Sequence, residues 1–162
     1  MCGKSKRGRS VALLLTGLAA LAASPSLLAQ KPDVKSRIVP PVAATAGGKT
    51  TVAVEMTLGP KWHVNSHTPS EDFLIPTEVK LETSAGKLSA VRYPKQVTKK
   101  FAFSDKPLWV YEGTVRFEVD LDLPVGTKGT VALSGTAFYQ ACNEEQCFMP
   151  ESVPLEAKIA IR

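Results

Sequence analysis

The 162-residue sequence predicts an all-β protein whose strands form an antiparallel sandwich or barrel. Three observations lead to this fold class. Apolar and polar residues alternate with a period of two along most of the chain, as expected of half-buried strands. Turn signals rich in glycine and proline separate the alternating segments. No segment carries a convincing helical stripe of apolar residues.

The clearest alternation covers residues 114–123, where Val115, Phe117 and Val119 point to one face and polar residues to the other. Comparable strands are expected at 51–58, 130–139 and 153–161, and shorter ones at 37–43, 77–82 and 87–93. Turns are expected at Gly47-Gly48, Gly59-Pro60, Ser84-Ala85-Gly86 and Pro124-Val125-Gly126. Residues 94–108 lack the alternation and are expected to form a long loop, a kind of segment that is often functional.

Residues 1–29 have the pattern of a secretory signal peptide, with a basic start followed by the apolar run 11–23. That run is shorter than the roughly 20 residues that a membrane span needs. We expect cleavage after Ala29; the alternatives are cleavage near Ala20-Leu21-Ala22 and an uncleaved anchor. Residues 30–36 are then a flexible lead-in, and residues 37–162 form one domain. We expect the mature protein to be exported, periplasmic and not inserted in the membrane.

The formal net charge of +5 does not indicate a nucleic-acid ligand. The leader holds four of the 20 basic residues and none of the 15 acidic ones, so the rest of the chain carries 16 bases against 15 acids. It contains no basic patch interleaved with aromatic residues. It also lacks a G-x-S-x-G motif, a metalloprotease helix and a glycine-rich phosphate loop, which argues against the common hydrolytic chemistries.

Two cysteines, Cys142 and Cys147, lie in the segment AFYQACNEEQCFMPE, at residues 137–151. They can form a disulfide if the chain turns back between them, because the two Cα atoms must come within about 7 Å. Asn143 favours such a turn. In an exported protein the disulfide is expected to form and persist. The pair is then either redox-active, at a strand end or in a hairpin, or a structural clip that stabilises the turn.

The C-x4-C spacing differs from the C-x-x-C that begins a helix in thioredoxin-type sites, where the helix dipole favours the thiolate. Here strand-like sequence flanks the pair. Glu144 and Glu145, if close, would raise the pKa of a thiol by repulsion of like charge. The pair is therefore better suited to exchange in which a partner's thiolate attacks the disulfide.

His63 and His67 are the only histidines, and with the two cysteines they could form a zinc or copper site. The order is the reverse of a zinc finger, and residues four apart on an extended strand are separated by roughly 13 Å. We therefore expect neither a metal nor another cofactor. Instead, we expect that Trp62 packs in the core and that the histidines line a loop.

Three blocks of sequence resemble the N-terminal periplasmic domain of the thiol:disulfide interchange protein DsbD. They are KWHVNSHTPSEDFLIPTEVKLE from residue 61, PLWVYEGTVRFEVDL from residue 107 and AFYQACNEEQCFMPESVPLEAKI from residue 137. The last is the most specific, with Tyr139 and Gln140 before the first cysteine and Pro150 after the second. The resemblance covers roughly residues 37–161.

The resemblance implies an immunoglobulin-like antiparallel β-sandwich that carries both cysteines in a β-hairpin. It implies a monomeric protein-disulfide reductase-type shuttle, reduced by a membrane-embedded thiol reductase and reducing periplasmic thioredoxin-like proteins in turn. By the same resemblance, Cys147 forms the mixed disulfide with partners and Cys142 resolves it. The other hypothesis is a non-catalytic protein-binding sandwich in which the disulfide is structural.

The family also has a cap loop with an aromatic residue that covers the disulfide. In this chain the match falls within residues 94–108, where Phe103 is the first choice and Phe101 the second. Such a lid would exclude adventitious thiols until a partner displaces it.

Overall fold

The computed structural model describes residues 31–162, and the predicted signal peptide, residues 1–29, lies outside them. The described residues form eleven strands and no helix, and hence no helix that could cross a membrane. The strands belong to three antiparallel sheets.

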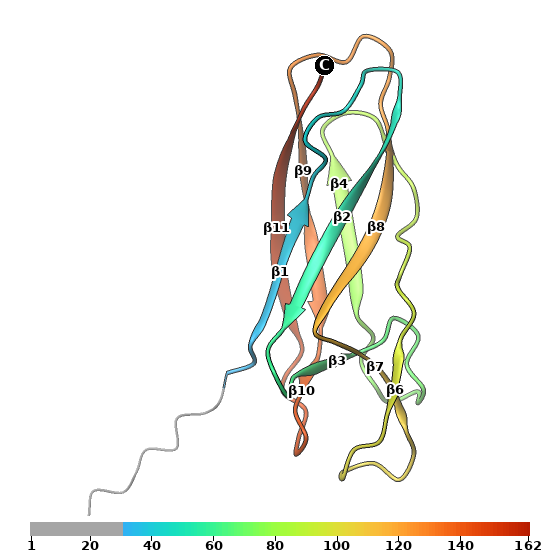
Figure 1. Cartoon of the computed structure of the whole chain (residues 1–162), viewed down its shortest axis with the longest axis vertical. Coiled ribbons are helices and arrows are strands. Elements are labelled where there is room, and N and C mark those ends of the chain that lie inside the picture. The colour runs from blue at the N-terminus through green and yellow to red at the C-terminus, as the bar shows by residue number, and fades with distance from the viewer. Residues whose placement is uncertain (1–30) are drawn as a thin grey trace, which may run out of the picture. The chain divides into compact units, whose positions relative to one another are not determined.

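Two of the sheets are the layers of a sandwich (Figure 1). The first has the strand order β1 (Val34–Val39), β2 (Lys49–Leu58), β8 (Thr114–Asp122) and β5 (Lys87–Leu88). The second has the order β11 (Glu151–Ala160), β9 (Thr130–Tyr139) and β4 (Glu78–Thr83). The predicted all-β, immunoglobulin-like antiparallel sandwich is therefore confirmed.

The hydrophobic core lies between these layers and follows the predicted alternation. Met56 of β2 and Phe117 of β8 are fully buried from one layer, and Leu133 of β9 and Ile159 of β11 from the other. Polar residues of the same strands face solvent. Burial of apolar side chains at about 25 cal/mol per Å² is the main stabilising contribution to such a core.

A third, smaller sheet lies at the lower end of the sandwich in Figure 1. Its strand order is β10 (Ala141–Cys142), β3 (His63–Asn65), β7 (Leu108–Glu112) and β6 (Val97–Lys99). Three of these strands directly continue or precede a sandwich strand: β3 follows β2, β7 precedes β8 and β10 follows β9. The core layers therefore fix where the small sheet lies.

Gly113 makes the bend between β7 and β8. Its φ of 65° lies in the left-handed region, and its carbonyl accepts a hydrogen bond of 2.8 Å from the amide of Leu58. A residue with a Cβ pays about 1–2 kcal/mol in that region, whereas glycine does not. The glycine thus allows the chain to pass from β7 in the small sheet directly to β8 in the sandwich.

Some expected boundaries were wrong. The strand expected at 37–43 is β1, which begins at Val34, so the lead-in expected at 30–36 overlaps it: all six residues of β1 pair with residues 53–58 of β2. The strand expected at 87–93 has only two paired residues besides an isolated bridge at Arg92. The loop expected at 94–108 contains β6, whose residues pair with β7. In each case cross-strand pairing, which local sequence does not show, sets the boundary.

We expect Gly113→Ala to lower the free energy of unfolding by about 1 kcal/mol, because alanine is strained at this φ. No atom lies within 4 Å of a Cβ added there, so backbone conformation alone causes the loss. Gly113→Asn is the matched control: asparagine tolerates the left-handed region better and should lose less stability. Urea unfolding of both variants measures this, and equal losses would contradict the backbone explanation.

Candidate functional site

A tight hairpin holds the two cysteines. Cys142 ends β10, Cys147 lies directly opposite it across the turn, and the two form a disulfide with a Cα–Cα distance of 4.0 Å. The Asn143 amide donates to the Gln146 carbonyl at 2.9 Å. The Asn143 side-chain oxygen accepts from the amides of residues 145 and 146, each at 2.9 Å. Asn143 therefore builds the turn, as its side-chain chemistry predicted.

The two sulfur-bearing residues differ sharply in exposure. Cys142 is 0% exposed, whereas Cys147 is an exposed residue. The difference follows from position, since Cys142 belongs to a paired strand and Cys147 to the outer arm of the hairpin. A thiolate arriving from solvent therefore meets Cys147 first.

Four residues form one row across the small sheet. Cys147 is opposite Cys142, Cys142 is opposite His63 of β3, and His63 is opposite Glu112 of β7. Directly opposite residues of antiparallel strands project to the same face, with Cβ atoms about 4.5–5.5 Å apart. The disulfide, the imidazole and the carboxylate are therefore consecutive neighbours on one face.

His63 is almost completely enclosed. It is 1% exposed, and the ring of Phe101 stacks on it with a centroid distance of 4.0 Å. Neither ring nitrogen has a hydrogen-bond partner among residues 31–162. Burial is the main cause that lowers the pKa of His63 to about 4, so the ring is neutral at pH 7.

The loop between β6 and β7 covers this face of the small sheet. Phe101 is 1% exposed and packs in a cluster with Leu74, Leu108 and Val110. Phe103 stacks on the Phe101 ring at 5.3 Å and is 41% exposed. The structure thus places the two candidate cap residues in two layers, with Phe101 inside against His63 and Phe103 outside.

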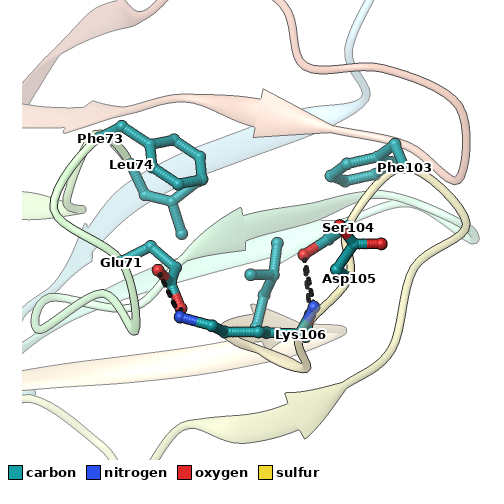
Figure 2. A pocket seen from close by; sticks show the side chains of 8 residues that line it. Glu71, Phe73, Leu74, Phe103, Ser104, Asp105 and Lys106 are labelled. Atoms are coloured by element: carbon teal, nitrogen blue, oxygen red, sulfur yellow. Dashed lines mark hydrogen bonds and ion pairs between the residues drawn. The ribbon is translucent and has the colours of Figure 1, made fainter.

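Figure 2 shows a pocket of about 280 Å³ beside this loop. Phe103 borders it on one side and Phe73 on the other. Lys106 also lines the pocket, forms an ion pair of 3.1 Å with Glu71 and follows Asp105 in the loop. Phe73 is 76% exposed, so the pocket opens next to an apolar surface.

Lys99, the last residue of β6, joins the loop to the cysteine hairpin. Its ammonium group contacts Glu112 at 2.6 Å and Glu144 at 3.1 Å, and it lies 5.3 Å from the centroid of the Phe101 ring. The hydrogen bond to Glu112 is the main cause that raises the pKa of Lys99. The negative charge of Glu144, expected to oppose a thiolate, is thus paired with a cation.

Three further residues named from the sequence surround the hairpin. Tyr139 is buried and its hydroxyl donates to Glu151 at 3.3 Å; burial and this carboxylate raise the pKa of Tyr139 to about 12. The side-chain amide of Gln140 donates to the backbone carbonyl of Phe148 at 3.0 Å, across the hairpin. Pro150 is half-buried just before β11. Tyr139 and Gln140 therefore hold the two arms of the hairpin.

The two histidines do not act together. His67 stacks on Tyr93 at 3.6 Å, and its Nδ1 lies 3.1 Å from the carbonyl oxygen of Thr77. Within the described residues no group of three or more His, Cys, Asp or Glu side chains is arranged to hold a metal ion.

Sequence reasoning missed Lys99 and Glu112 and expected His63 to line a loop. Nothing local distinguishes these residues, because strand register brings them to the cysteines from separate segments. The sequence feature nearest to a signal for a buried His63 was its position between the apolar residues Trp62 and Val64 in KWHVN. All three residues are buried in the structure.

We expect the buried His63 to make the stability of the folded protein depend on pH. Below about pH 6.5 the unfolded chain binds a proton at this residue, but the folded protein does so only near pH 4. The free energy of unfolding should therefore fall as pH drops through this window, by up to about 3 kcal/mol from this residue. His63→Phe should lack that component and His67→Phe should keep it. Denaturant unfolding at several pH values tests this; parallel curves for wild type and His63→Phe would contradict it.

The comparison with protein families adds to this geometry. The family described as thiol:disulfide interchange protein DsbD, N-terminal, matches residues 35–157. No curated protein matches the sequence.

Two of the solved structures that match the chain are also DsbD-type or ScsB N-terminal domains. The N-terminal periplasmic domain of ScsB from Proteus mirabilis has a TM-score of 0.50 at 16% identity, over 76% of this chain and 43% of that one. The chain thus spans less than half the length of that structure. The N-terminal domain of Neisseria meningitidis DsbD, in the reduced form, has a TM-score of 0.44 at 18% identity, over 69% of this chain and 79% of that one. Because the family match extends over most of the chain, the protein belongs to the DsbD N-terminal domain family.

Proposed function

We propose that this protein carries out thiol–disulfide exchange through Cys142 and Cys147 and carries electrons to exported proteins. The observation that supports this most directly is the unequal exposure of the two cysteines, with Cys147 exposed and Cys142 buried. Exchange requires a thiolate to approach one sulfur of the disulfide along an open path. Family membership supports the same chemistry.

The reaction has two steps. A donor thiolate attacks the sulfur of Cys147, a donor–Cys147 disulfide forms, the Cys142–Cys147 bond breaks, and Cys142 leaves as a thiolate with the electron pair. A second donor thiol then attacks the mixed disulfide and releases Cys147, so the donor dithiol is oxidised and the pair is reduced. Passing the electrons on reverses these steps with an oxidised acceptor: Cys147 attacks, and Cys142 resolves the mixed disulfide.

A structural clip is a weaker explanation of the disulfide. Backbone and side-chain hydrogen bonds already close the hairpin at Asn143, Gln140 and Phe148. Closing so short a ring adds only about 2 kcal/mol of loop entropy. The non-catalytic binding module nevertheless remains the rival function, and the cysteine variants below distinguish the two.

The partners we propose are dithiol proteins: a membrane-embedded thiol reductase as donor and periplasmic thioredoxin-like proteins as acceptors. Membership of the DsbD N-terminal family supports this assignment. A periplasmic location agrees with the predicted signal peptide and with the description of the ScsB structure as a periplasmic domain. We propose that the protein acts as a monomer.

We propose that Phe101 and Phe103 together form the cap. Phe101 stacks on His63, the cross-strand neighbour of Cys142, and Phe103 stacks on Phe101. Lys99 ties the start of this loop to Glu144 in the cysteine hairpin. A partner that displaces the outer ring would therefore loosen the inner one.

We expect Cys142→Ser to accumulate mixed disulfides with a thioredoxin-like protein that keeps only its attacking cysteine, activated as a disulfide with a small aromatic thiol. Cys147 attacks that cysteine, the small thiol leaves as a thiolate, and neither protein holds a second thiol that could resolve the product. Cys147→Ser should form none, since its remaining thiol is buried. Non-reducing electrophoresis and mass spectrometry of the adducts measure both. Equal trapping by the two variants would contradict the assigned roles, and no trapping by either would favour the binding module.

We expect Phe101→Ala to increase the rate at which glutathione reduces the disulfide by about tenfold. The Phe101 ring covers His63, the cross-strand neighbour of the buried Cys142, so its loss should open the Cys142 side of the disulfide. Phe103→Ala, which removes only the half-exposed outer layer, should increase it less. Stopped-time alkylation and mass spectrometry give the rates. Wild-type rates in both variants would show that the loop does not shield the disulfide.

A further inference from the structure

The buried ring of His63 has no function in the exchange steps written above, yet its environment is unusual. Both ring nitrogens are buried and lack hydrogen-bond partners among the described residues. An unsatisfied buried polar group costs about 1–3 kcal/mol, whereas a phenyl ring of similar shape would carry no such penalty. A partner that appears in another state of the molecule would account for a histidine here.

The cross-strand register points to that partner. Cys142 is directly opposite His63 and is 0% exposed, so both side chains lie on one face and out of solvent. In the oxidised protein the Cys142 sulfur is bound to Cys147 and has no proton to donate. After reduction the same sulfur becomes a thiol or a thiolate, which can donate or accept a hydrogen bond.

We propose that His63 is the hydrogen-bond partner of the Cys142 sulfur when the disulfide is open, and that it selectively stabilises the reduced pair. This inference rests on the proposed exchange function and assigns a positioning residue to it. The disulfide offers the imidazole little to bind, so the interaction favours reduction.

The neutral ring serves both forms of the sulfur without a proton transfer. One ring nitrogen carries a hydrogen and the other does not. When Cys147 is attacked and Cys142 leaves as a thiolate, the N–H donates to that thiolate. When the Cys142 thiolate takes up a proton, the ring turns its bare nitrogen towards the sulfur and the thiol donates to that nitrogen.

The charged groups that face His63 are two carboxylates and one ammonium. Glu112 is opposite it on β7, Glu144 lies in the cysteine hairpin, and Lys99 of β6 bridges the two carboxylates. Phe101 covers the ring from the loop side. Burial outweighs the two carboxylates and lowers the pKa of His63, so the ring stays neutral at pH 7, where exchange would occur.

The test compares His63→Phe, which keeps a flat ring against Phe101, with His63→Gln, which keeps a donor and an acceptor. His67→Phe is the matched control, because His67 packs on Tyr93 in another part of the fold. Two quantities are measured. The first is the equilibrium between each protein and reduced and oxidised glutathione. The second is the pKa of the Cys142 thiol, from thiolate absorbance in a Cys147→Ser background.

We expect His63→Phe to shift the glutathione equilibrium about tenfold towards the disulfide, which for a two-electron couple is about 30 mV. It should also raise the pKa of the Cys142 thiol. His63→Gln should recover much of both effects, and His67→Phe should change neither.

A purely structural role for His63 predicts the opposite pattern, in which His63→Phe is at least as stable as wild type and shifts neither quantity. That result would overturn the inference and leave the exchange function intact. Failure of the wild-type pair to exchange with glutathione would instead overturn the proposed function. The thiol pKa would then still decide whether His63 binds the Cys142 sulfur.

Discussion

The pairing of β10 with β3 is the constraint on which the rest of the site depends. Only two residue pairs make it, Ala141 with Val64 and Cys142 with His63. This pairing buries one cysteine against the small sheet and leaves the other on the free arm of the hairpin. Without it the disulfide would be a symmetric surface loop, and neither sulfur would be distinguished as the point of attack.

The sandwich makes that pairing possible. Strands β2 and β9 lie in opposite layers of the core, and each continues past its layer into the small sheet as β3 and β10. The positive φ of Lys61, at 69°, and that of Gly113 redirect the chain at this point. The site makes few contacts of its own, and the stable core of the sandwich keeps its strands in place.

The charged groups around the cysteines carry a small excess of negative charge. Lys99 pairs with both Glu112 and Glu144, so one cation offsets two carboxylates only in part, and no excess positive charge faces the sulfurs. The described residues form no helix whose dipole could act on the pair, and the Lys99 ammonium is already paired with carboxylates. The features that lower the pKa of a strongly nucleophilic cysteine are therefore not available here. This agrees with the proposed exchange through contact with partners, in which the cap would control access to the disulfide and the buried imidazole would shift the equilibrium between its oxidised and reduced forms.

The sequence was informative where structure follows from local alternation. Strand β9 has the bounds expected from its pattern, 130–139, because it is the central strand of its layer and alternates fully. The turn at Asn143 was also predictable, since the side chain forms its own backbone hydrogen bonds. Val34 to Ser36 were missed because β1 is an edge strand with only partial burial. The association of Lys99, His63 and Cys142 could not be predicted, because register between distant segments creates it.

The central claim is that the Cys142–Cys147 disulfide exchanges under conditions where structural disulfides persist. Its reduction potential tests this most directly, by equilibration of the folded protein in glutathione buffers, alkylation of free thiols and mass spectrometry. The account predicts a value between about −180 and −270 mV, the range of exchange proteins. A value below about −300 mV, typical of structural disulfides, would contradict it.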